Sequence, residues 1–148
     1  MKRAGIGFTG FFMIGTPGDT FKKFLKTYRF AQYSQPDEVR FYNTIPYPGT
    51  ELFEWIKNHG KFLIHYEEYL NKIERWEGKP VFETKEFPAA QRITAFNLAE
   101  KLVMRKFFQK YFGGFYFLPY FFWQNQALRH LALAPGQRLW LFLRRRIK

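Results

Sequence analysis

The sequence predicts an α/β fold made of two parallel βα units followed by a helical extension. The first sixty residues follow the order strand, helix, strand, helix, and short turns rich in proline and glycine separate them. A single crossover helix between two strands favours a parallel pair with a right-handed connection. Two strands alone cannot form a parallel sheet covered on both faces, so we expect this part of the chain to belong to a larger sheet.

The first predicted strand covers residues 7–14, a short apolar run bounded by glycine. Residues 16–19, Thr-Pro-Gly-Asp, predict a tight turn, because proline fixes one φ angle and glycine accepts positive φ. Asp19 or Thr20 should cap the helix that follows. Its apolar residues have the spacing of an amphipathic helix: Phe21, Phe24, Leu25 and Tyr28.

The second predicted strand covers residues 39–45 and ends at the turn Pro-Tyr-Pro-Gly of residues 46–49. Thr50 should cap a helix that runs to about Asn58, and Gly60 should stop it. Both units therefore have the same plan, in which a strand leads through a proline–glycine turn into a helix.

The rest of the chain divides at residue 88, which gives segments 1–60, 61–87 and 88–148. No hydrophobic period is evident in residues 61–87, so we interpret them as an irregular connection. Segment 88–148 should be a basic, aromatic helical extension, with a long helix from Pro88 to the glycine pair at 113–114 and a short helix near 124–134. The predicted buried stripe of the long helix is Ile93, Phe96, Ala99, Val103 and Phe107.

The positive charge is concentrated in the second half of the chain. Of the net charge of +12, ten positive charges lie after Glu100, where the sequence has no acidic residue. Such asymmetry indicates an anionic partner, either lipid headgroups or nucleic acid. Nucleic acid is the weaker alternative, because no recognition motif for it occurs in the sequence.

Aromatic residues in 107–123 are compatible with packing into a core or over the rest of the larger sheet, with lying at a bilayer interface, or with stacking on bases. The apolar run 139–143 is followed by an arginine cluster, which predicts a contact with an anionic membrane through Arg138, Trp140, Arg144, Arg145 and Arg146. The most apolar run, 112–123, is shorter than the roughly 20 residues of a membrane span and contains Pro119. We therefore expect a cytoplasmic protein, peripheral at the inner face of the membrane if the tail contacts lipid.

The sequence has no cysteine, which excludes disulfides, thiolate metal sites and a cysteine nucleophile. Its three histidines, His59, His65 and His130, match no metal-binding spacing, so we expect this chain to bind no metal. We expect no signal peptide, because the apolar run near the start is too short.

Two motifs carry a resemblance to radical SAM enzymes. Residues 13–20, Met-Ile-Gly-Thr-Pro-Gly-Asp-Thr, are similar to the family's apolar-apolar-Gly-x-Pro-Gly-Glu-Thr turn after barrel strand five. Residues 46–50, Pro-Tyr-Pro-Gly-Thr, resemble its Pro-Gly-Thr turn after strand six. One helix and one strand separate the motifs, as in the family, and the resemblance is strongest to its cobalamin-binding branch and to the methylthiotransferases.

The resemblance implies that the two units belong to a partial (β/α)6 TIM-like barrel. In the family, S-adenosylmethionine and a [4Fe–4S] cluster meet at the carboxyl edge of the strands, and one branch also carries cobalamin. Met13 and Gly15 would be the adenine-side positions. Asp19 stands where the family usually has glutamate, and it keeps a carboxylate at a helix N-terminus.

By the same resemblance, the chain is the C-terminal fragment of a radical SAM enzyme. The family's Cys-x3-Cys-x2-Cys cluster motif is absent from this sequence. We therefore expect the fragment to form part of the S-adenosylmethionine and substrate wall, to have the missing N-terminal half as a partner, and not to be catalytic alone. A truncated gene, an incomplete gene model and a split protein would each produce such a piece. The alternative function is a small basic membrane-surface or adaptor protein that has reused a barrel fragment.

Overall fold

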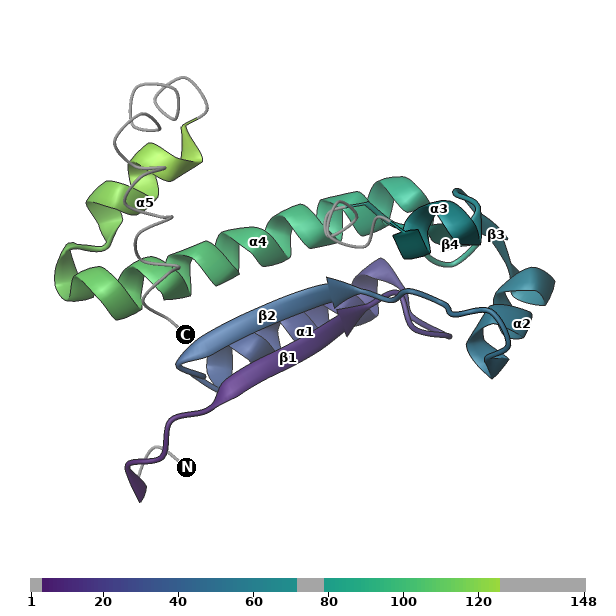
Figure 1. The fold of residues 1–148 in the computed structure, drawn as a ribbon. Coiled ribbons are helices and arrows are strands. Elements are labelled where there is room, and N and C mark those ends of the chain that lie inside the picture. Colours follow the sequence, from purple (N-terminus) through teal and green to yellow (C-terminus); the bar gives the residue numbers. More distant parts are fainter. Residues whose placement is uncertain (1–3, 72–78, 126–148) are drawn as a thin grey trace. The chain divides into compact units, whose positions relative to one another are not determined.

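The computed structural model describes residues 4–71 and 79–125. The chain forms two compact units, Met1–Lys106 and Phe107–Lys148. Figure 1 shows the order of the helices and strands. They are β1 (Thr9–Ile14), α1 (Phe21–Tyr33), β2 (Glu38–Asn43), α2 (Glu51–His59), β3 (Gly60–Phe62), α3 (Tyr66–Asn71), β4 (Phe82–Thr84), α4 (Ala89–Phe112), the 3-10 turn η3 (Gly113–Phe115) and α5 (Phe117–Gln124).

The parallel pair expected from the sequence is confirmed. β1 and β2 lie side by side in parallel, with Thr9 opposite Glu38 and Ile14 opposite Asn43 (Figure 1). The crossover helix α1 begins after Thr20, whose side chain accepts the backbone N–H of Lys23 at 3.1 Å. Thr20 is thus the helix cap. The described part of the chain is an α/β structure with a parallel two-stranded sheet and helices.

One face of this sheet is packed against helices. β1, α1, β2 and α4 as far as Val103 contribute to a single hydrophobic cluster, in which Phe24 of α1 lies edge-on to Phe41 of β2. Fully burying a phenylalanine side chain stabilises a fold by about 1.5–3 kcal/mol. The buried members are Ile14, Phe24, Ala31, Val39, Phe41, Phe87, Ala95, Phe96, Ala99 and Leu102. Because α4 enters this cluster, the first compact unit continues beyond residue 88, where the sequence suggested a division.

The buried stripe of α4 differs from the predicted one by part of a turn. Phe96 and Ala99 are buried as expected, but Ile93 is 42% exposed. Arg92 takes the buried position four residues before Phe96 and is 2% exposed. The prediction was wrong here because a pattern of apolar residues never selects arginine for a core position. The buried side chains of α4 are Arg92, Ala95, Phe96, Ala99 and Leu102.

Residues 61–87, interpreted from the sequence as irregular, contain ordered structure. β3 and β4 form an antiparallel pair with Gly60 opposite Thr84 and Phe62 opposite Phe82. They pack, with α2 and α3, on a second hydrophobic cluster whose buried members are Ile56, Tyr69, Val81 and Phe82. Strands of three residues are too short to produce a recognisable alternation in the sequence.

In the second unit, α4 ends at Phe112 and η3 turns the chain into α5 (Figure 1). The stop predicted at the glycine pair is confirmed, since Gly113 has a φ of +55° directly after the helix. The helix expected near 124–134 lies almost entirely outside the described residues. Within them, α5 ends at Gln124. Among the helices of the described residues, none is both long and apolar enough to cross a membrane.

Candidate functional site

The two proline–glycine turns begin at the same edge of the parallel sheet. Directly after β2, Thr44 donates both its backbone N–H and its hydroxyl to the carbonyl of Ile14, at 2.9 and 3.1 Å. This buried pair of hydrogen bonds ties together the carboxyl ends of β1 and β2. Ligands of open parallel sheets generally bind at this edge.

The first turn is closed by a carboxylate. Gly15 follows β1 with a φ of +88°, a conformation that favours glycine. Its N–H donates to the Asp19 carboxylate at 2.9 Å, and the N–H of Asp19 donates to the carbonyl of Thr16 at 2.9 Å. Asp19 therefore holds the turn from within, while the neighbouring Thr20 caps the helix.

A buried arginine from α4 lies against this turn. Arg92 donates its Nε–H to the carbonyl of Phe87 at 2.9 Å. Its guanidinium lies over the ring of Phe82, 4.2 Å from the ring centroid, and over the ring of Phe87 at 5.2 Å. A Cβ atom on Gly15 would overlap Nη1 of Arg92 and lie only 2.6 Å from its Cζ. The close approach of the guanidinium is thus a second reason for glycine at this position.

Two carboxylates compensate the buried charge of Arg92. Burial lowers the pKa of Arg92 to about 10, and the nearby carboxylates of Asp19 and Glu83 act in the opposite direction. Glu83 also accepts the N–H of Ala89 at 2.9 Å at the start of α4. At neutral pH the guanidinium remains charged beneath the first turn. Sequence reasoning missed Arg92, because arginine is almost never fully buried and no local pattern in the sequence marked this one.

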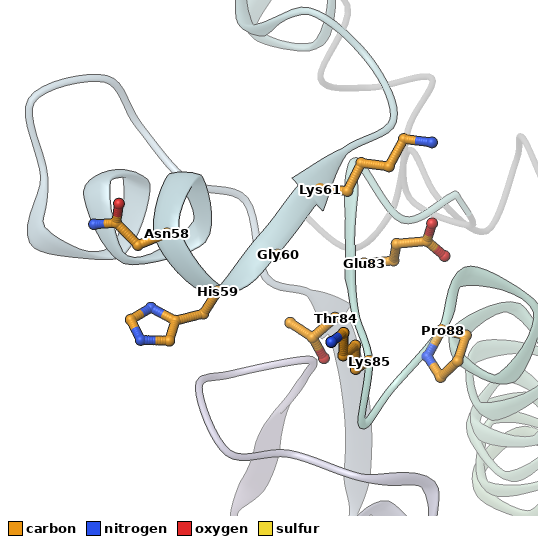
Figure 2. Close-up of a pocket in the computed structure, with 8 residues that line it drawn as sticks. All are labelled: Asn58, His59, Gly60, Lys61, Glu83, Thr84, Lys85 and Pro88. Atoms are coloured by element: carbon orange, nitrogen blue, oxygen red, sulfur yellow. The ribbon is translucent and has the colours of Figure 1, made fainter.

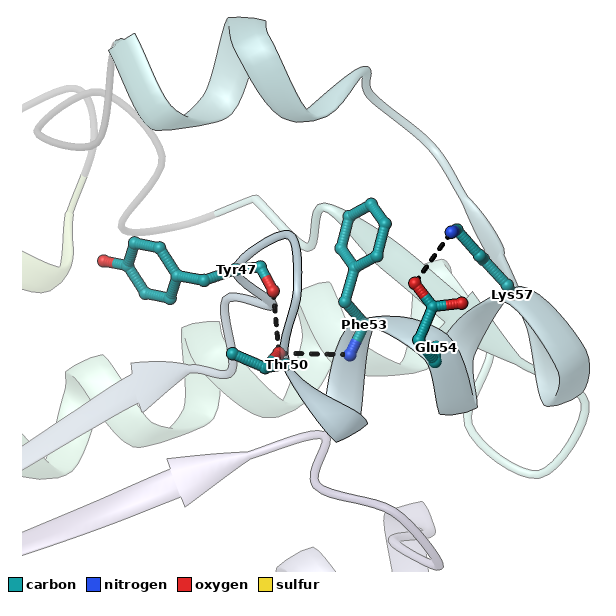
Figure 3. Close-up of polar contacts among 5 residues, drawn as sticks. All are labelled: Tyr47, Thr50, Phe53, Glu54 and Lys57. Carbon is teal, nitrogen blue, oxygen red and sulfur yellow. Dashed lines mark hydrogen bonds and ion pairs between the residues drawn. The ribbon is translucent and has the colours of Figure 1, made fainter.

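The second turn is built from local hydrogen bonds, drawn in Figure 3. Thr50 donates its hydroxyl to the carbonyl of Tyr47 at 2.7 Å and accepts the N–H of Phe53 at 3.3 Å. Gly49 has a φ of +82°, and a Cβ there would meet no atom within 4 Å. The predicted cap of α2 by Thr50 is confirmed. Farther along α2, Glu54 and Lys57 form an exposed ion pair of 2.8 Å (Figure 3).

A buried tyrosine is hydrogen-bonded to the backbone of the second turn. Tyr69 of α3 donates its hydroxyl to the carbonyl of Pro46 at 2.6 Å and has no exposed surface. Burial raises the pKa of Tyr69 to about 12. This contact links the turn after β2 to the second hydrophobic cluster.

The sheet face opposite α1 is open. Met13 is 57% exposed and lies opposite the exposed Tyr42 in the parallel register. Phe11, also exposed, stacks on Tyr42 with ring centroids 6.3 Å apart. Arg40 adds an exposed cation next to Phe11 on the same face. This open face, made by Phe11, Met13, Arg40 and Tyr42, leads directly to the edge where the two turns begin.

The predicted site residues separate into three environments. Met13 lies on the open face, Gly15 is buried against Arg92, and Asp19 is half-buried within its turn. The predicted membrane contacts, Arg138, Trp140, Arg144, Arg145 and Arg146, lie outside the described residues. Within residues 4–71 and 79–125, no three His, Asp or Glu side chains gather as they would around a metal ion.

A pocket of about 470 Å³ lies at a different place in the first unit, between the end of α2 and the β3–β4 pair (Figure 2). It is lined by Asn58, His59, Gly60, Lys61, Glu83, Thr84, Lys85 and Pro88. The ring of His59 is stacked on Trp55, and its Nδ1 lies 2.9 Å from the Trp55 carbonyl oxygen. Since none of Met13, Gly15 and Asp19 lines this pocket, it is separate from the turns.

Comparison with known proteins gives one distant similarity. No protein-family model matches the chain, and no solved structure matches it. The chain is 28% identical over 116 residues to an uncharacterized methyltransferase of Pyrococcus horikoshii. The similarity covers 73% of this chain and 24% of that protein, so the chain spans about a quarter of the length of the relative it matches.

Proposed function

We propose that the first unit is the last pair of βα units of a radical SAM barrel and forms one wall of an S-adenosylmethionine and substrate site. The observation that supports this most is the common edge of the two turns. The motifs that resemble the family's turns after strands five and six leave adjacent parallel strands, tied by the Thr44 to Ile14 hydrogen bonds. The resemblance required β1 and β2 to be parallel, because the strands of a (β/α) barrel are parallel.

The open face supports the barrel part of this proposal. In a (β/α) barrel, helices cover the outer face of the strands, and the other face looks into the barrel. Here α1 covers one face, while Phe11, Met13 and Tyr42 stay exposed on the other. Large apolar side chains that cluster on an exposed surface generally have a partner. The remaining barrel strands, supplied by a further polypeptide segment, are the proposed partner.

S-adenosylmethionine is the proposed ligand of this wall. The similarity to a protein named a methyltransferase supports it, because S-adenosylmethionine is the usual methyl donor of such enzymes. Met13 presents an exposed thioether, which makes favourable contacts with aromatic rings such as adenine. Gly15 would contribute backbone atoms alone, since the Arg92 guanidinium occupies the space that a side chain at this position would need. Asp19 would act indirectly, by holding the N–H of Gly15 in place.

The chemistry is proposed for the complete barrel. This sequence has no cysteine, so a [4Fe–4S] cluster would be held by the further polypeptide segment proposed to complete the barrel, as would cobalamin if the enzyme belongs to that branch. The chain by itself is therefore proposed to be non-catalytic. Its residues shape the wall, and Arg92 and Asp19 fix the turn that faces the ligand.

The proposal can be tested by titrating S-adenosylmethionine into the isotope-labelled chain and following backbone amide chemical shifts. We expect weak, saturable shifts at the amides of Met13 and Gly15. Adenosine should shift the same amides and methionine should not, because these are the proposed adenine-side positions. Absence of shifts at millimolar ligand, or shifts confined to other residues, would contradict the proposal.

The chain offers a matched pair of carboxylates for the control. Asp19 accepts the Gly15 N–H at 2.9 Å at the carboxyl edge of the sheet, and Asp37 accepts the Phe8 N–H at 2.8 Å at the amino edge. Asp19→Ala should abolish the shifts caused by adenosine, whereas Asp37→Ala should preserve them. Equal loss in both variants would mean that the shifts report general stability and not this site.

A further inference from the structure

The outer side of α5 is an exposed aromatic surface. Phe117, Leu118, Phe121 and Phe122 follow the i, i+1, i+4, i+5 spacing that places residues on one side of a helix, and each is at least 44% exposed. Phe115 in η3 precedes them and is 75% exposed. We call these five residues the aromatic face.

The inner side of α5 already has a packing role. Tyr120 lies against Phe108 of α4 with ring centroids 6.3 Å apart, and Trp123 stacks on Tyr120 at 6.1 Å. The helix therefore has two distinct sides, one used for packing within the second unit and one left exposed. Single exposed apolar residues are ordinary, but five within eight positions are typical of a binding surface.

The charge of the surrounding sequence favours an anionic lipid surface as the partner. No acidic residue follows Glu100, and the second unit contains seven lysines and arginines. The aromatic face itself carries no charged group and no hydrogen-bond donor or acceptor on its side chains. Apolar rings flanked by basic residues suit the boundary between headgroups and acyl chains, where the rings enter the apolar layer and the cations meet lipid phosphates.

We propose that the aromatic face docks on an anionic bilayer with α5 lying in the plane of the interface. This inference concerns the second unit and is independent of the ligand proposed for the first. Because α5 has eight residues and no described helix is suited to crossing a membrane, the helix would rest on the surface. Binding would hold the barrel piece beside the membrane.

The test is flotation of the full chain with vesicles of phosphatidylcholine alone or mixed with phosphatidylglycerol, at low and high salt. We expect flotation with the mixed vesicles, weakened several-fold by salt. The double variant F117S/F121S should lower the affinity by about a hundredfold, on the order of tenfold for each phenylalanine. Phe115→Ser should lower it by about tenfold on its own.

Phe30→Ser is the matched control, since Phe30 is a 63% exposed phenylalanine on α1 in the other unit. It should float like the unaltered chain. Absence of flotation, or flotation unchanged by F117S/F121S, would overturn the proposal. The proposal would also be overturned if F117S/F121S had a lower mass in solution than the parent chain and still floated normally. The aromatic face would then join two copies of the chain.

Discussion

Replacing Gly15 by alanine should destabilise the first unit by roughly 2.5–5 kcal/mol. A positive φ at a residue with a Cβ costs about 1–2 kcal/mol. The new methyl group would also overlap the Arg92 guanidinium, which would have to move. A flexible arginine tip normally moves at little cost, but this one is 2% exposed, stacked on Phe82 and bonded to the Phe87 carbonyl. Losing that charged hydrogen bond adds about 1.5–3 kcal/mol.

Gly49→Ala is the matched control for this prediction. Gly49 has a φ of +82°, close to that of Gly15, but a Cβ there has open space around it. Its replacement should therefore show the backbone cost alone, about 1–2 kcal/mol. The difference between the two alanine variants isolates the contact with Arg92.

A double-mutant cycle with Arg92→Ala completes the experiment. With the guanidinium removed, Gly15→Ala should cost no more than Gly49→Ala, which corresponds to a coupling of about 1.5–3 kcal/mol. Urea unfolding followed by far-UV circular dichroism measures each free energy, provided that the m-value stays constant. The reasoning is refuted if Gly15→Ala and Gly49→Ala cost the same, or if removal of Arg92 leaves the cost of Gly15→Ala unchanged.

Three further predictions concern the second turn and the arginine cluster. Tyr69→Phe should cost about 1–3 kcal/mol at neutral pH, because it leaves the Pro46 carbonyl without its buried donor. Since burial raises the pKa of Tyr69 from 10.0 to about 12, its stabilising effect is complete below pH 10 and is lost as the pH rises toward 12. The difference in unfolding free energy between the parent chain and Tyr69→Phe should therefore shrink over that pH range in urea titrations. A constant difference would argue against the raised pKa of Tyr69. Thr50→Ala should cost about 1 kcal/mol, because the N–H of Phe53 loses its cap; no change in thermal midpoint would show the cap to be dispensable. Deleting residues 137–148 should weaken flotation with anionic vesicles, and equal flotation of the shortened chain would remove the arginine cluster from the membrane contact.

The local parts of this fold could be predicted from the sequence. Gly18, Thr20 and Thr50 act on their immediate neighbours, so the turns and helix starts follow from residue identity. The parallel order of β1 and β2 also followed, because a single helix joins two strands. These features depend on the identity and order of residues that lie close together in the sequence.

The parts that could not be predicted depend on distant contacts. The burial of Arg92 needs the rings of Phe82 and Phe87, the carbonyl of Phe87 and the space left by Gly15. The β3–β4 pair joins two runs of three residues across α3. Of the candidate site, Met13, Gly15 and Asp19 could be named in advance, but the arginine that lies against the turn could not.

The link between Gly15 and Arg92 has a consequence for how the molecule is made. The turn emerges early in synthesis, whereas the arginine that lies against it arrives only with α4, far later in the chain. Contacts between residues distant in sequence form slowly, since the intervening chain must first be ordered. A nascent or proteolysed product that stops before α4 would carry both proline–glycine turns and still lack the arginine that lies against the first of them.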